Sequence, residues 1–169
     1  MNNSVVLDGY NVIHAVPELA RQLDRSLESA RAALISLCGA YRARRGDVER
    51  LQVVFDGSDA DVGGPRENQH GITVLFTRQG EEADERILSL LRAEGSHGRF
   101  IVVSNDTEVT NNARALGAQV LSADQFYGQT QPAGSKRPKQ LPIEKAPLST
   151  LDAQRITEEY RKHLDRKSK

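Results

Sequence analysis

The chain has 169 residues, 38% of them hydrophobic and 27% charged, which suits one globular domain and leaves no room for a second full one. A single cysteine, Cys38, excludes an internal disulfide framework and favours a reducing compartment. No apolar stretch approaches the roughly 20 residues of a membrane span, and the N-terminus lacks a signal-peptide pattern. We therefore expect a cytoplasmic protein without a membrane partner.

The formal net charge is zero, but the two signs are unevenly divided along the chain. Residues 1–128 contain 13 arginines and 18 acidic residues, a net charge of −5, and no lysine. Residues 129–169 contain 10 basic and five acidic residues, a net charge of +5. The division predicts an acidic body over 1–128 and a basic extension over 129–169.

Short runs rich in valine and isoleucine recur along the acidic body. They are mostly continuous apolar runs, which is typical of parallel strands covered on both faces. The predicted strands span residues 4–7, 51–55, 72–76, 100–103 and 119–121.

Helical patterns separate these runs. One long helical segment is predicted between the first two strands, because apolar residues recur there at spacings of three and four. Further helices are predicted over 82–93 and 107–116, and Ser122 with Gln125 predicts a capping box that opens a short last one. The apolar stripe of the first segment consists of Leu19, Leu23, Leu27, Ala30, Leu34, Leu37, Cys38 and Tyr41.

Strands that alternate with helices predict a three-layer α/β sandwich around a mainly parallel sheet. Residues 57–71 have almost no large apolar side chain and are predicted to form a surface loop. Residues 128–147 contain four of the six prolines and are predicted to form an extended linker. Beyond the linker, an amphipathic helix is predicted from Leu151, Ile156, Tyr160 and Leu164.

Three of the predicted strands end on a carboxylate. Asp8, Asp56 and Asp106 each follow an apolar run, and "EEADER" at 81–86 places Asp84 and Glu85 in the first turn of a helix. The carboxyl ends of parallel strands form the ligand crevice of an open sheet, so these side chains are expected to converge. Taken singly, each aspartate also suits a turn or a helix cap.

A converging set of carboxylates needs a counter-charge. Two carboxylates about 5 Å apart repel by roughly 3 kcal/mol at an effective dielectric of 20. Hard oxygen ligands favour Mg²⁺ or Mn²⁺, and the four histidines are too scattered to favour zinc. Asn11, Ser104 and Asn105 add neutral polar groups able to hold a phosphate oxygen or a metal-bound water. Cations held in this way can activate water and stabilise a phosphodiester displacement.

The segments "VVLDGYNVI" (5–13), "VVFDG" (53–57), "ADERI" (83–87) and "VVSNDTEV" (102–109), in this order, resemble the NYN domain of the PIN-like nuclease superfamily. Over about residues 4–127 the chain is most similar to the YacP-like group of bacterial ribonucleases. The resemblance implies a PIN-like Rossmannoid sandwich and metal-dependent RNA cleavage. It also implies messenger RNA as the target and an association with the ribosome. At matching positions it implies metal-site residues Asp8, Asp84 and Asp106, supported by Asn11, Asp56 and Glu85.

RNA bound beside such a site requires basic groups, because an acidic crevice repels a polyanion. Phosphate contacts of this kind give salt-dependent affinity with little sequence preference. Tyr10, beside Asp8, is the best-placed aromatic residue for stacking on a base, and a packing role suits it equally well. The candidate phosphate-binding residues are Arg66, His70 and Arg78, with Arg21 and Arg25, and in the linker Lys136, Arg137 and Lys139.

Two other functions are compatible with the pattern. A phosphatase with a strand-end aspartate nucleophile is disfavoured, because position 10, where such enzymes place a second aspartate, is tyrosine. A non-catalytic RNA- or ribosome-binding module with a nuclease-like fold is the stronger alternative. A metal-dependent endoribonuclease is the leading prediction, since every expected acidic position is filled.

Overall fold

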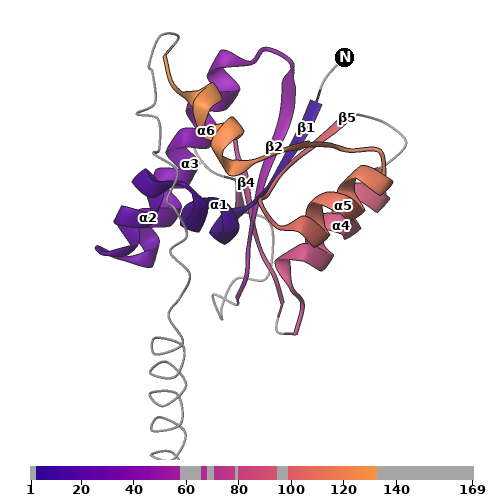
Figure 1. Cartoon of the computed structure of the whole chain (residues 1–169), viewed down its shortest axis with the longest axis horizontal. Helices are drawn as coiled ribbons and strands as arrows, with labels where there is room; N and C mark the ends of the chain where they lie inside the picture. The colour runs from indigo at the N-terminus through magenta and orange to yellow at the C-terminus, as the bar shows by residue number, and fades with distance from the viewer. Residues whose placement is uncertain (1–2, 58–65, 68–70, 79, 95–98, 133–169) are drawn as a thin grey trace, which may run out of the picture. The chain divides into compact units, whose positions relative to one another are not determined.

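The computed structural model describes residues 3–57, 66–67, 71–78, 80–94 and 99–132 (Figure 1). All of these residues belong to one compact unit, Met1–Ala133. Within them, no helix combines the length and the apolar character that a membrane span needs.

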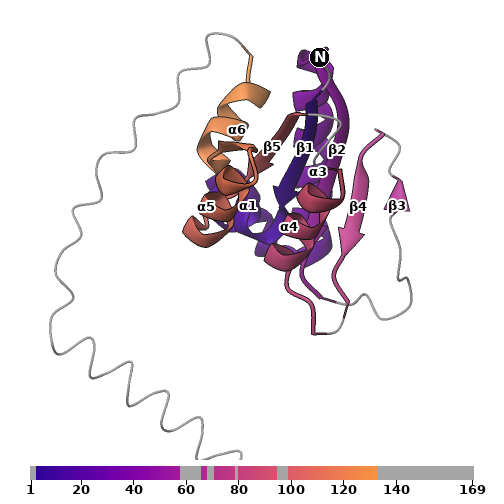
Figure 2. The same cartoon turned by 90° about the vertical axis from the view of Figure 1, so that its right-hand side faces the viewer.

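The described strands form a single sheet in the order β3-β4-β2-β1-β5-β6. Every neighbouring pair is parallel except β3 and β4, which are antiparallel. Figure 2 shows β3 beside β4 at one edge of the sheet. The strands are β1 (Asn3–Asp8), β2 (Val48–Phe55), β3 (Arg66–Glu67), β4 (Thr73–Phe76), β5 (Arg99–Val103) and β6 (Gln119–Leu121).

Helices cover both faces of the sheet, as Figure 1 shows. One layer contains α1 (Gly9–Ala15), α2 (Pro17–Leu23), α3 (Leu27–Arg44) and α6 (Ala123–Thr130). The other layer contains α4 (Ala83–Glu94) and α5 (Thr107–Ala115). The predicted three-layer α/β sandwich with a mainly parallel sheet is confirmed.

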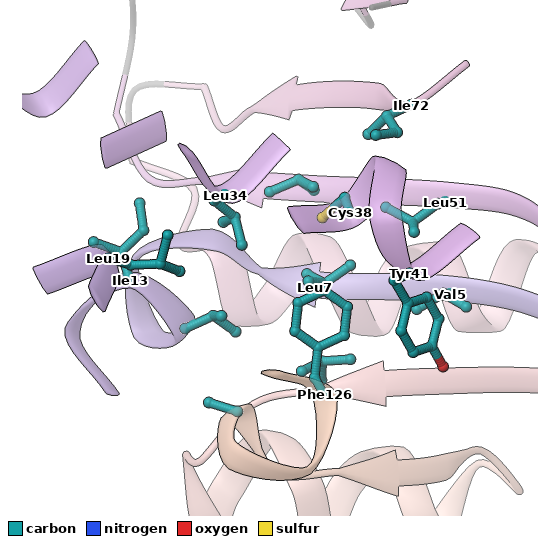
Figure 3. Close-up of a cluster of buried hydrophobic side chains, with 14 of the residues drawn as sticks. Val5, Leu7, Ile13, Leu19, Leu34, Cys38, Tyr41, Leu51, Ile72 and Phe126 are labelled. Carbon is teal, nitrogen blue, oxygen red and sulfur yellow. The ribbon is translucent and has the colours of Figure 1, made fainter. Parts of the chain in front are cut away.

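Alternate side chains of the central strands enter two separate cores, which explains their continuous apolar runs. On β1, Val5 and Leu7 pack in the core under α1, α2, α3 and α6, whereas Val6 packs in the core under α4 and α5. Figure 3 shows Leu7 in the first core together with Cys38 of α3 and Phe126 of α6. Cys38 is fully buried, and burial raises the pKa of its thiol, which suits a packing role.

The long helical segment predicted between the first two strands is divided into three helices. Pro17 begins α2, because proline suits the first turn of a helix and cannot continue α1 through its missing N–H. Ser26 begins α3 by accepting a hydrogen bond from the backbone N–H of Ser29. Leu27, predicted to be part of the apolar stripe, is 45% exposed.

Other boundaries also differ from the predictions. The segment 57–71 was predicted to be a loop, but β3 lies within it. The last helix among the described residues, α6, opens with the predicted capping box of Ser122 and Gln125. It runs to Thr130 and so crosses the predicted boundary between body and linker. The predicted helix from Leu151 lies outside the described residues.

Candidate active site at the strand ends

The site lies where the strand order reverses. From β1 the chain passes to β2 and β4 on one side, and it then returns to β5 and β6 on the other side of β1. The carboxyl ends of β1 and β5 therefore flank a topological switch point, the usual ligand position in an open α/β sheet. Leu7 is level with Val103, so Asp8 and Ser104 follow them side by side.

Asp8 is the most buried of the five predicted carboxylates at the site. It is 7% exposed and caps α1, accepting a hydrogen bond at 3.5 Å from the backbone N–H of Asn11. The Ser104 hydroxyl lies 3.3 Å from the other carboxylate oxygen and donates to it. Burial, with repulsion from Asp84 and Asp56, raises the pKa of Asp8 from its ordinary 3.8 to about 6, although both hydrogen bonds oppose the rise.

Asp106 caps the next helix on the other side of the switch point. Its Oδ1 accepts hydrogen bonds from the backbone N–H groups of Glu108 at 2.8 Å and Val109 at 3.1 Å. Its own backbone N–H donates to the Ser104 hydroxyl oxygen at 3.0 Å. Ser104 therefore joins the two aspartates, since its hydroxyl contacts both.

Asn11 and Asn105 form a second connection across the switch point. Asn11 Oδ1 accepts the backbone N–H of Asn105 at 2.7 Å, and Asn105 Oδ1 accepts that of Ala123 at 2.9 Å. A backbone N–H can only be accepted by the amide oxygen, so these bonds fix the orientation of both side-chain amides. The –NH₂ group of each amide is then the end available as a donor to a ligand.

Asp56 holds the helix that carries Asp84. Its Oδ1 accepts a 2.6 Å hydrogen bond from the backbone N–H of Ala83, the first residue of α4. The turn after Asp56 needs Gly57, whose φ is +103°, and the Gly57 N–H donates to the Thr77 hydroxyl oxygen at 3.1 Å. Thr77 is 2% exposed and follows β4 directly.

Asp84 lies within electrostatic reach of the other carboxylates. Its pKa is raised by burial and by repulsion from Asp106, Asp56, Glu82 and Glu108. The four residues Asp8, Asp56, Asp84 and Asp106, here called the strand-end carboxylates, therefore share one end of the sheet. Glu85, the fifth predicted acidic residue, is exposed on α4.

The strand-end carboxylates match a hard divalent cation in chemistry, because they supply oxygen donors and excess negative charge. Asp56 and Asp106 each have one oxygen already engaged by helix N–H groups. Among the described residues, no three His, Cys, Asp or Glu side chains gather closely enough to hold a metal ion. The donor set fits Mg²⁺ or Mn²⁺, whereas the side-chain positions are not those of a formed coordination site.

The predicted RNA-binding residues are only partly described. Arg78 is exposed just after β4, and Arg21 and Arg25 are exposed around the end of α2. Arg66 lies in β3. His70, Lys136, Arg137 and Lys139 lie outside the described residues.

Two residues near the strand ends were not predicted. Thr77 follows an apolar run as the aspartates do, so the same signal would have found it. Arg31, which donates hydrogen bonds to the Tyr10 hydroxyl, gives no such signal, because the contact joins residues 21 positions apart.

Comparison with known proteins gives consistent matches. The chain is 37% identical to YacP of Bacillus subtilis (strain 168) over 89 residues, which are 53% of this chain and about half (51%) of that protein. Two crystal structures of Rae1 (YacP) from Bacillus subtilis are also similar. The first, of a mutant, has a TM-score of 0.64 at 30% identity and covers 77% of this chain and 75% of that one. The second has a TM-score of 0.60 at 26% identity and covers 97% and 83%, respectively.

The family model of the YacP-like NYN domain matches residues 5–169. This match extends beyond residues 4–127, where the sequence motifs show the resemblance, into the C-terminal segment. NYN domains are nuclease-like, which agrees with carboxylates at the strand ends. The chain therefore belongs to the YacP-like NYN domain family.

Proposed function

We propose that this protein is a divalent-metal-dependent endoribonuclease that hydrolyses phosphodiester bonds of single-stranded RNA. The observation that carries the proposal is the position of Asp8, buried at the switch point with its pKa raised by burial and by two other carboxylates. A buried carboxylate held beside like charges is costly for the fold, and such arrangements concentrate at functional sites.

Some of the site residues would supply negative charge for the cation, and others would orient the carboxylates. Asp8, Asp84 and Asp106 supply the negative charge that would hold Mg²⁺ or Mn²⁺, with Asp56 and Glu85 at the periphery. When bound, the cation would supply Lewis-acid activation of water and stabilisation of the phosphate charge. Ser104 keeps Asp8 and Asp106 in register through its hydroxyl.

Asn11 is suited to contact the phosphate directly. Its amide oxygen is engaged by Asn105, so its –NH₂ group would donate to a non-bridging phosphate oxygen. Because this donor is neutral, it can bind the phosphate without reducing the negative charge that attracts the cation. Arg66, His70 and Arg78, with Lys136, Arg137 and Lys139, would supply the counter-charge for the rest of the RNA.

The same proposal includes messenger RNA as the target, the ribosome as a partner and a cytoplasmic location. The target and the partner are supported by family resemblance, and the location by the single cysteine, which suits a reducing compartment. The chemistry of the site supports RNA cleavage in general.

The test is cleavage of labelled single-stranded RNA in Mn²⁺ or Mg²⁺ by the wild type and by Asp84→Asn. Removing one carboxylate should lower the rate at least about 100-fold, because metal-dependent hydrolysis depends on charge at the reacting centre. Asp47→Asn is the matched control. Asp47 directly precedes β2, at the opposite end of the strands from the carboxylates, and contacts Asn3 and Arg45.

Equal cleavage by the wild type and Asp84→Asn, or none by either, would overturn the proposal. RNA binding without metal-dependent cleavage would favour the alternative function, a non-catalytic RNA- or ribosome-binding module. One observation favours this alternative: among the described residues, no three potential ligand side chains lie close enough together to hold a metal ion.

A further inference from the structure

A cluster of three aromatic side chains lies at the same end of the sheet as the strand-end carboxylates. Tyr10 comes two residues after Asp8, Phe55 immediately before Asp56, and Phe76 immediately before Thr77. The ring centroids of Tyr10 and Phe55 are 5.0 Å apart, and those of Phe55 and Phe76 are 5.7 Å apart. These spacings are typical of interacting aromatic pairs.

Arg31 of α3 joins these rings from the side of the helix layer. Its guanidinium carbon lies 5.0 Å from the ring centroid of Phe76 and 5.5 Å from those of Phe55 and Tyr10. Its Nε also donates to the Tyr10 hydroxyl at 2.9 Å, and a second guanidinium nitrogen contacts the same oxygen. Arg31 thus holds the Tyr10 ring in position through its hydroxyl.

The three rings differ in burial. Phe55 is fully buried, which makes it part of the core, whereas Tyr10 and Phe76 are only partly buried. If Tyr10 only filled space, a phenylalanine would pack equally well. The Tyr10 hydroxyl, which accepts hydrogen bonds from Arg31, would then have no purpose. A tyrosine oriented in this way keeps a rigid ring at the same end of the strands as the carboxylates, packed against the core under α1 and α3.

We propose that Tyr10, held in position by Arg31, is a stacking platform for one unpaired base of the RNA beside the phosphate at the strand-end carboxylates. The inference rests on the proposed function, because it names a subsite of the same RNA. Every base has a π-face, so a single ring gives affinity for unpaired RNA with little sequence preference. Arg31 acts here as a positioning residue.

The test compares single-stranded oligoribonucleotides of one sequence, each lacking a different single base, with the intact oligonucleotide. Binding is measured by fluorescence anisotropy in EDTA at low salt, so that cleavage does not interfere. In the wild type, loss of the stacked base should weaken binding by about 5- to 150-fold, the range for one base–aromatic stack. In Tyr10→Ala, the intact RNA should bind more weakly by a similar factor, and the penalty for that missing base should disappear.

Two variants separate stacking from positioning. Tyr10→Phe keeps the ring but loses the bond to Arg31, and Arg31→Lys keeps the charge but loses the planar contact with the rings. Both should retain a smaller penalty for the missing base. Tyr127→Ala is the matched control: Tyr127 is also a partly buried tyrosine packed on the same core, and its removal should lower the melting temperature without changing the penalty.

An equal missing-base penalty in the wild type and Tyr10→Ala, with both proteins folded, would overturn the stacking site. So would the absence of any single-base penalty in the wild type. If the wild type cleaves RNA but shows no Tyr10-dependent penalty, only this inference fails. If the penalty depends on Tyr10 but no cleavage occurs, the proposed nuclease activity fails and the stacking site stands.

Discussion

Gly9, which follows Asp8 directly, occupies a position that admits no side chain. A Cβ added there would lie 2.4 Å from two ring carbons of Phe55 and 2.9 Å from the carbonyl oxygen of Val54. The close packing of Gly9 against Phe55 therefore connects the turn after β1 to the end of β2. The "DG" in "VVLDGYN" is explained by this contact and not by an unusual backbone angle.

Gly9→Ala should lower the free energy of unfolding by about 1–3 kcal/mol, because the ring and the backbone beside it must move. Urea denaturation measures the change. Gly128→Ala is the control, since nothing lies within 4 Å of a Cβ built at that helical position. It should be neutral or stabilise by up to about 1 kcal/mol. Equal effects of the two substitutions would show that the contact with Phe55 is unimportant.

Asp8 should destabilise the metal-free fold as pH rises. Its pKa is about 6 in the folded protein against 3.8 ordinarily, so the folded state binds the proton more tightly. The stabilising effect of that proton is fully present below pH 3.8 and is lost as pH rises through 6, at a cost of about 3 kcal/mol.

Asp8→Asn should therefore stabilise the metal-free protein by about 1–3 kcal/mol at pH 7.5 and by little near pH 4. Denaturant unfolding of both proteins in EDTA across this range measures the difference. A difference that stays constant with pH would show that Asp8 does not titrate as its environment implies.

Residue positions were predictable from the sequence where a strand ends. Asp8, Asp56 and Asp106 each follow an apolar run, and the carboxyl ends of parallel strands lie at the same end of the sheet. The hydrogen bonds of Ser104 and the contacts of Arg31 were not predictable. They depend on side chains that meet across the sheet or across a helix layer, and no spacing in the sequence encodes such pairs.

At the scale of elements, α5 depends on the same carboxylate that the site uses. Asp106 accepts the N–H groups of Glu108 and Val109, which removes two of the unpaired donors of the helix N-terminus. An asparagine can make the same bonds through its side-chain oxygen, whereas an alanine cannot.

Asp106→Ala should therefore lower stability by about 1 kcal/mol, and Asp106→Asn should have a smaller effect. Both should lose most RNA cleavage, because both remove the charge. Thermal unfolding together with the cleavage assay separates the two roles. If Asp106→Asn cleaves RNA as fast as the wild type, Asp106 serves only as a cap.

The element boundaries show where sequence periodicity fails. The apolar stripe from Leu19 to Tyr41 suits one helix, and the same residues also suit two helices that pack on the same face of the sheet. Ser26 decides between them, since it favours a helix start, and Pro17 separates α2 from α1 in the same way. The two-residue strand β3 has too few residues for a recognisable pattern.

At the scale of the whole molecule, the sandwich was predictable because strands and helices alternate and connect locally. The order of the strands was less accessible, since it requires knowing that the chain crosses β1 between β4 and β5. That crossing creates the switch point and brings Asp8 and Asp106 together. The division into an acidic body and a basic extension stays a prediction for the extension, of which the structure describes only residues 129–132.

Isothermal titration calorimetry with Mn²⁺ tests most directly whether carboxylates from separate segments act as one site. The wild type should bind Mn²⁺, Asp8→Asn and Asp84→Asn should each bind about 10- to 100-fold more weakly, and Asp47→Asn should bind like the wild type. No binding by the wild type, or equal binding by all four proteins, would contradict a shared metal site at the strand ends.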